Sequence, residues 1–156
     1  MPRPDATVDS SFWIHAYRSG LLPYVLSRFS VWYTLEVGRE LSERFPSGRE
    51  FWRMVRAREL DEVTPLRQQV RMFSPGERSA INVVLDRRDW FLLLDDRRPY
   101  EEAKRLGINV VCTPLLVAEI VQENTIDTLE ARRMLARLAQ PRTVSPEMIR
   151  QALGML

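Results

Sequence analysis

Two adjacent carboxylates directly follow the most apolar short run in the chain. The segment 91–94 contains no polar residue, and Asp95 and Asp96 come next. An uninterrupted apolar run of this length is typical of a strand buried on both faces of a parallel sheet. Binding sites in such sheets form beyond the carboxyl ends of the strands. The pair is therefore a candidate functional site. Because successive residues of a strand point to opposite faces, we expect one carboxylate of the two to face it.

Other acidic residues occupy comparable positions. Asp9 ends the predicted strand 6–9, while Glu40 and Glu77 lie on predicted helices that can face the same edge of the sheet. Clustered carboxylates repel one another and burial adds to the cost, so such a cluster requires either a cation or protonation of some members. Because the candidate ligands are oxygen atoms without paired histidines or cysteines, the chemistry favours Mg²⁺ or Mn²⁺ over zinc.

Three of these carboxylates also have a purely structural interpretation. Asp9 can cap the helix that follows it, and Glu40 can lie on a solvated helix face. Ser74 and Glu77 have the spacing of a capping box at the start of a helix. Residue patterns alone therefore indicate an α/β domain with a candidate acidic metal site.

The elements around the acidic pair predict how it is positioned. Helical spacing over 97–107 and a second apolar run over 108–112 form a strand–helix–strand unit with 91–94, and its crossover forces parallel pairing. Asp96 is placed to cap the helix 97–107, which makes Asp95 the better candidate for chemistry. A further strand is predicted over 31–33, and helices are predicted over 10–19, 21–29, 35–44, 49–59, 74–89, 115–123, 129–138 and 145–156.

The composition is that of an ordinary globular domain. The 156 residues are 45% hydrophobic and 28% charged, which suits one domain spanning 1–156 with a substantial core. We find no apolar stretch long enough to cross a bilayer and no apolar signal-peptide core. Cys112 is the single cysteine, so an internal disulfide is excluded. We therefore expect a reducing, cytoplasmic location and no membrane partner.

The basic residues are almost all arginines. Of the 23 lysines and arginines only Lys104 is a lysine, and the formal net charge is +2. The planar guanidinium group suits phosphate binding. Because the arginines are spread along the chain, a general compositional bias is favoured over a dedicated phosphate-binding patch. His15, the single histidine, lies on the predicted helix 10–19, and we interpret it as a structural or surface residue.

Five short segments carry a family resemblance through their order and spacing. They are Val8-Asp9-Ser10-Ser11, Glu40-Leu41, Gly76-Glu77-Arg78-Ser79-Ala80-Ile81, Leu93-Leu94-Asp95-Asp96, and Ala103-Lys104-Arg105-Leu106-Gly107-Ile108 leading to Thr113. In this arrangement the chain resembles the PIN-domain family of metal-dependent nucleases, and in particular the branch related to VapC toxins. The resemblance runs from about Thr7 to Ile126 and continues more weakly to the end of the chain.

The resemblance implies a fold and a ligand set. The fold is a three-layer α/β/α arrangement around a central, mainly parallel sheet of four to five strands. The metal ligands carried over are Asp9, Glu40, Glu77 and Asp95, with Asp96 as the alternative to its neighbour. Ser10 or Thr113 would assist through a hydroxyl group. The segment Cys112-Thr113-Pro114-Leu115 departs from the Gly-Thr-x-Gly pattern usual in this branch, and its proline lacks an N–H, so the role of Thr113 stays open.

The activity implied by the resemblance is hydrolysis of RNA phosphodiester bonds. Bound Mg²⁺ or Mn²⁺ would polarise the scissile phosphate and lower the pKa of a water that attacks in line. Arg97 and Arg98 can bind backbone phosphates or can simply be solvated residues at a helix start. A single-stranded substrate suits a narrow acidic cleft, and the resemblance implies an antitoxin partner and a homodimer.

Two other functions stand beside this one. The alternative is a catalytically silent PIN-like module that binds RNA or protein. A magnesium-dependent phosphatase with an aspartyl nucleophile is less favoured. Its nucleophile loop usually reads Asp-x-Asp after the first strand, whereas Asp9 is followed here by Ser10 and Ser11.

Overall fold

The centre of the molecule is a five-stranded parallel sheet. The computed structural model describes residues 2–140 and 144–156. The strands lie in the order β3-β2-β1-β4-β5, and every neighbouring pair is parallel. Their bounds are β1 Asp5–Val8, β2 Ser30–Tyr33, β3 Asp61–Glu62, β4 Phe91–Leu93 and β5 Asn109–Val111. The predicted mainly parallel sheet of four to five strands is confirmed.

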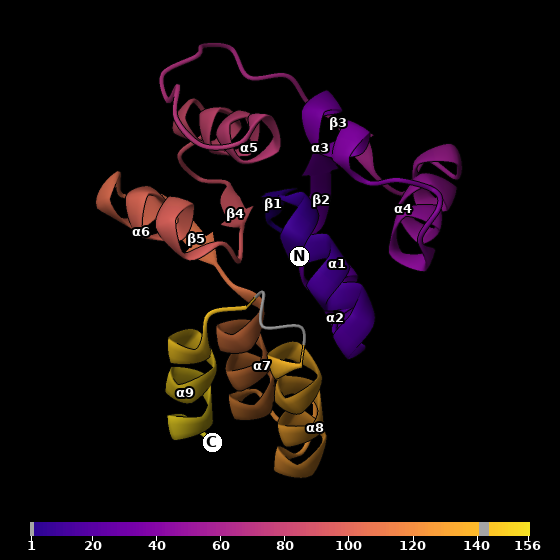
Figure 1. Ribbon diagram of the computed structural model, residues 1–156, viewed down its shortest axis with the longest axis vertical. Coiled ribbons are helices and arrows are strands. Elements are labelled where there is room, and N and C mark those ends of the chain that lie inside the picture. Colours follow the sequence, from indigo (N-terminus) through magenta and orange to yellow (C-terminus); the bar gives the residue numbers. More distant parts are fainter. Residues whose placement is uncertain (1, 141–143) are drawn as a thin grey trace.

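Helices cover both faces of this sheet, which makes the fold a three-layer α/β/α arrangement (Figure 1). One buried cluster joins the sheet to α1, α2, α4, α7 and α8, and a second joins it to α5 and α6. Side chains alternate between the two clusters along β4, since Leu93 belongs to the first and Leu92 to the second. The helices are α1 Ser10–Ser19, α2 Leu22–Arg28, α3 Leu35–Glu40, α4 Pro46–Arg56, α5 Pro75–Leu85, α6 Arg97–Arg105, α7 Thr113–Gln122, α8 Thr128–Ala139 and α9 Pro146–Gly154.

The strand register brings the ends of β1 and β4 together. Val8 pairs with Leu93, and the N–H of Asp9 donates to the carbonyl oxygen of Leu93 at 2.9 Å. The two central strands therefore finish at one level, and the acidic residues that follow each of them lie at the same edge of the sheet.

Some element boundaries differ from the predicted ones. The helix predicted over 35–44 ends at Glu40, where the chain turns before the buried Leu41. The short edge strand β3 was not predicted, because both of its residues are exposed acids with low strand propensity. None of the described helices combines the length and the apolar character needed to cross a bilayer.

Candidate functional site

Asp9 is a buried carboxylate at the carboxyl edge of the sheet. It is 1% exposed and caps α1, with Oδ2 accepting from the N–H of Ser11 at 3.1 Å. Its other oxygen, Oδ1, is buried and accepts no hydrogen bond from the described part of the protein. Burial, followed by the charges of Glu77 and Glu40, raises the pKa of Asp9 to about 8. Asp9 is thus both a helix cap and a carboxylate with one unmatched oxygen.

The Glu40 carboxylate is hydrogen-bonded to the first turns of two helices, α1 and α5. Its Oε2 accepts from Ser10 Oγ at 2.6 Å, and its Oε1 accepts from the N–H of Gly76 at 2.8 Å. A Cβ at position 76 would lie 2.6 Å from Glu40 Oε2 and closer still to Oε1, so only glycine leaves room for the carboxylate. Glu40 is exposed, as expected for a solvated helix face, but these two bonds also tie its carboxylate to α1 and α5.

Glu77 combines the capping role with a position in the acidic group. Ser74 and Glu77 form the predicted capping box, with Ser74 N–H donating to Glu77 Oε1 at 3.1 Å and Glu77 N–H donating to Ser74 Oγ at 3.4 Å. Burial, and then a hydrogen bond with the Asp96 carboxyl group, raise the pKa of Glu77. The side chains of Glu77 and Asp96 therefore meet, although they come from α5 and from the end of β4.

Asp95 points into a different environment from Asp96. Its Oδ1 accepts from Thr113 N–H at 2.6 Å, and its Oδ2 accepts from Thr113 Oγ1 at 2.6 Å and lies 2.6 Å from His15 Nδ1. The Asp95 side chain is fully buried and His15 is 5% exposed, so the network is closed to solvent. Both oxygens of Asp95 are satisfied by protein groups.

Asp96 does not have the role that its position at the start of α6 predicts. Asp96 occupies the cap position of α6 as predicted, but its side chain makes no capping hydrogen bond. It is exposed and faces Glu77 instead. The capping role expected of the Asp96 side chain was therefore wrong, and the choice between Asp95 and Asp96 as the ligand stays a prediction.

His15 contacts Asp95, whereas the sequence left both a structural and a surface role open for it. It is buried rather than on the surface. The i, i+3, i+4 spacing of Phe12, His15 and Ala16 was the available signal, since Phe12 and Ala16 mark the buried stripe of α1. Its hydrogen bond to Asp95 joins residues 80 positions apart, which periodicity cannot reveal.

The arginines that follow the acidic pair differ in their partners. Arg97 forms ion pairs with Glu101 at 3.0 Å and with Glu147 at 2.7 Å. Arg98 is exposed and has no hydrogen-bond or ion-pair partner within residues 2–140 and 144–156. Of the two guanidinium groups, that of Arg98 is the one available to a phosphate.

The donor set fits a hard divalent cation by its chemistry. Asp9, Glu40, Glu77 and Asp96 offer only carboxylate oxygens, and the unmatched Oδ1 of Asp9 lies in a field of like charge. In their present positions, however, no three His, Cys, Asp or Glu side chains of the described residues stand close enough to form a ready-made metal site. Ser10 and Gly76 hold both oxygens of Glu40, so Glu40 would have to turn from these hydrogen bonds to become a ligand, whereas Ser74 holds only one oxygen of Glu77.

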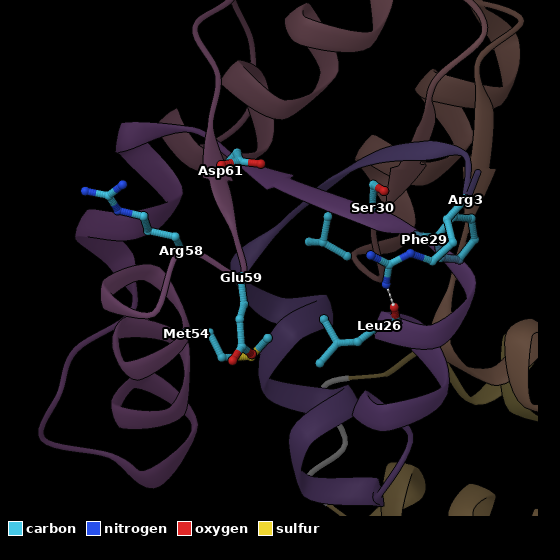
Figure 2. Close-up of a pocket in the computed structure, with 9 residues that line it drawn as sticks. Arg3, Leu26, Phe29, Ser30, Met54, Arg58, Glu59 and Asp61 are labelled. Carbon is cyan, nitrogen blue, oxygen red and sulfur yellow. Dashed lines mark hydrogen bonds between the residues drawn. The ribbon is translucent and has the colours of Figure 1, made fainter.

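One hollow is remote from this acidic group and another adjoins it. One, of about 360 Å³, lies at the amino ends of β2 and β3, at the opposite edge of the sheet (Figure 2). In that view the Arg3 guanidinium group donates to the Leu26 carbonyl oxygen at one side of the hollow, while Arg58 points away from it. The other hollow, of about 180 Å³, is lined by Glu40 itself. The larger hollow is remote from the carboxylates, and the smaller one adjoins them.

Comparisons with known proteins agree with this architecture. Residues 6–156 match the family model described as DUF3368, a PIN domain. The solved structure of the PIN domain endonuclease Utp24 is 11% identical, with 70% of this chain and 84% of that chain covered and a TM-score of 0.50. A PilT N-terminus domain protein, SSO1118, from the hyperthermophilic archaeon Sulfolobus solfataricus P2 is 15% identical, with 69% and 85% covered and a TM-score of 0.40. The comparison with curated proteins found no match. At 11% identity, the likeness to the Utp24 structure concerns the fold alone.

Proposed function

The chain belongs to the PIN domain family, whose fold is a nuclease fold, and on that premise we propose that it is an endoribonuclease dependent on Mg²⁺ or Mn²⁺. The proposed reaction is hydrolysis of phosphodiester bonds in single-stranded RNA. An antitoxin segment and a second copy of the chain are proposed partners on resemblance alone. The proposed setting is the cytoplasm, with which the free, buried thiol of Cys112 is compatible.

The observation that supports the proposal most directly is the unmatched oxygen of Asp9. A buried carboxylate oxygen without a donor costs free energy unless it is protonated or binds a cation. Asp9 Oδ1 is in this position, and the charges of Glu77 and Glu40 that act on Asp9 are negative. A structural cap needs one carboxylate oxygen only, so capping α1 does not account for the second one.

The proposed roles follow from where each side chain lies. Asp9, Glu77 and Asp96 would hold the cation, and Glu40 would join them by turning from Gly76. When bound, a divalent cation neutralises the phosphate and lowers the pKa of water. Ser10 Oγ, which now donates to Glu40, would be released to a phosphate oxygen. Arg98 would neutralise a neighbouring backbone phosphate.

Asp95 and Thr113 have a supporting role in this proposal. Their two hydrogen bonds fix the start of α7 against the end of β4. Holding Asp95 inward turns the following residue, Asp96, outward to Glu77. The proposed ligand set therefore takes Asp96 in place of Asp95.

A catalytically silent RNA- or protein-binding module is the alternative. It is favoured by the absence of a ready-made metal-binding group among the described side chains and by the hydrogen bonds that hold both oxygens of Glu40. In that case Asp9 would carry a proton at neutral pH.

Digestion of a short single-stranded RNA separates the two functions. The wild-type protein should cleave with Mn²⁺ or Mg²⁺ and should stop when chelator is added. The Asp9→Asn protein keeps an oxygen for the Ser11 cap and should be inactive under both conditions. RNA that is bound but stays intact with metal would support the silent module instead.

A further inference from the structure

The hollow beside Glu40 lies between α1 and the segment that joins α3 to α4. Its volume is about 180 Å³, below the range of roughly 300–1,000 Å³ typical of pockets for drug-sized ligands. It can hold one planar ring, whereas a helix or a folded loop would need a longer groove. Its lining includes Ile14 and Arg18 from α1, and Glu40, Ser42 and Phe45 from the opposite wall.

Phe45 is an aromatic side chain that the fold does not bury. It is 60% exposed, whereas Phe51, Trp13 and Tyr33 pack edge to face within the core. Among the described residues Phe45 has no aromatic ring partner. The phenyl ring is therefore available to a ligand.

The backbone under Phe45 is held firmly. Its N–H donates to the Ser42 carbonyl oxygen at 3.4 Å, and Pro46 follows as the first residue of α4. Gly48 lies so close to Ser42 that an added Cβ would overlap its carbonyl group. These contacts position the backbone from which the phenyl ring extends into the lining of the hollow.

Arg18 provides a free positive charge on the facing wall. It is exposed on the last turn of α1 and has no ion-pair or hydrogen-bond partner in the part of the chain that the structure describes. Other arginines, such as Arg28 and Arg56, are neutralised by glutamates at 2.7 Å. A phosphate would give Arg18 the partner that the fold does not.

We propose that this hollow, formed by Phe45, Arg18 and Ile14 beside Glu40, binds one unpaired nucleotide of a single-stranded nucleic acid. The base stacks on Phe45 over the apolar Ile14, and the backbone phosphate meets Arg18. Since Glu40 belongs both to the hollow and to the acidic group, this nucleotide lies next to the bond to be cut. The inference rests on the proposed function, which it deepens by requiring an unpaired base beside the cleavage point.

The test is a binding measurement that needs no cleavage. All variants are made in the 156-residue Asp9→Asn protein, and fluorescence anisotropy follows the binding of a short labelled single-stranded RNA. Phe45→Ala should raise the Kd about tenfold, in the range found when a base-stacking aromatic residue is removed. Phe45→Tyr should restore binding. Arg18→Ala should lower the slope of log Kd against log salt by about 0.7, as expected for one lost phosphate contact on a single strand.

Matched controls come from α8, at the end of the molecule that carries α7 and α9 (Figure 1). Leu129→Ala removes a side chain that is 58% exposed, and Arg132→Ala removes an exposed arginine. Neither change should alter the Kd or its salt dependence. The melting temperature of each variant should stay that of the parent, because both Phe45 and Arg18 are exposed.

Several results would overturn the inference. One is equal RNA affinity with and without the Phe45 ring. Another is the same loss of affinity for an RNA duplex, whose bases cannot stack on the ring. A shift of Phe45→Ala from dimer to monomer in size-exclusion chromatography would assign the ring to a protein interface. If wild-type protein cleaves RNA but Phe45→Ala binds normally, only the subsite fails; if Phe45 governs binding but wild-type protein never cleaves, only the nuclease proposal fails.

Discussion

Asp95 is buried and Asp96 is exposed, so replacing each of these neighbours by asparagine should have different effects on stability and on metal binding. Asp95→Asn puts an amide among groups that donate to both of its oxygens, namely Thr113 N–H, Thr113 Oγ1 and His15. Breaking a buried charged network of this kind should lower the free energy of unfolding by about 3 kcal/mol. Urea denaturation measures this loss, which should be present with and without metal.

Asp96→Asn should give the reverse result. Asp96 is exposed and lies against Glu77, so removing its charge should leave the free energy of unfolding unchanged or slightly higher. The rise in melting temperature on addition of Mn²⁺ should disappear. If Asp95→Asn instead leaves stability intact and removes the response to Mn²⁺, the assignment of the two residues is reversed.

The Glu40 carboxylate occupies the space of the absent Gly76 side chain, so a methyl group added there should displace it. Gly76→Ala would overlap Oε1 and Oε2 of Glu40 and expel the carboxylate from the α5 N-terminus. We expect a loss of about 2 kcal/mol in the free energy of unfolding and a smaller rise in melting temperature with Mn²⁺. Gly154→Ala is the control, since its Cβ would meet nothing within 4 Å. Comparable losses in both variants would show that the space beside Glu40 is unimportant.

The sequence could predict which residues gather at this edge but not how each one is held. A strand ending at Asp9 and another ending near Asp95 are visible in hydrophobic runs, and parallel pairing then brings their ends together. The direction of each side chain depends on partners far along the chain. The bonds of Asp95 to His15 and Thr113 span 80 and 18 positions. A pattern of apolar residues carries no information about such bonds.

At the scale of elements, Glu77 in the first turn of α5 has a capping role that can be tested separately from its charge. In Glu77→Gln the amide oxygen can still accept from Ser74 N–H, because glutamine also serves in capping boxes. The helix and the free energy of unfolding should therefore be preserved. The charge is lost, so the rise in melting temperature with Mn²⁺ should be abolished.

Ser74→Ala is the complementary change. It removes the hydroxyl that accepts from Glu77 N–H and donates to Glu77 Oε1, and it should cost about 1 kcal/mol. Because Ser74 N–H still donates to Glu77 Oε1, the carboxylate should stay in place. The Mn²⁺ response should persist in this variant. If Glu77→Gln behaves like Ser74→Ala, with a loss of stability and an intact metal response, Glu77 is a cap and nothing more.

Elements with strong local signals were predictable, and those defined by tertiary contacts were not. Helix α5 begins at the predicted Ser74-Pro75 signal, and α7 begins at Thr113 with Pro114 in its first turn. Helix α3 stops at Glu40 because Leu41 is buried while Glu40 is bonded to Ser10 and Gly76. Strand β3 is defined by its parallel pairing with β2, in which Trp32 lies opposite Asp61.

At the scale of the whole molecule, the raised pKa of Asp9 links folding to pH. In the unfolded chain Asp9 ionises near its ordinary value of 3.8, whereas in the folded, metal-free protein it ionises near 8. Between these values the folded state binds a proton that the unfolded state has lost. The free energy of unfolding of the chelated protein should therefore fall as the pH rises from about 4 to about 8. The raised pKa of Glu77 acts in the same direction.

Urea denaturation in chelator across this pH range measures the slope, and Asp9→Asn should flatten it because an amide does not titrate. A divalent cation competes with the proton for the ionised carboxylate, so the stabilisation by Mn²⁺ should be larger near pH 8 than near pH 5. Stability that rises with pH in chelator would mean that Asp9 is ionised at no cost in the folded state. The unmatched oxygen would then need no cation, and the main support for a metal-dependent nuclease would be removed.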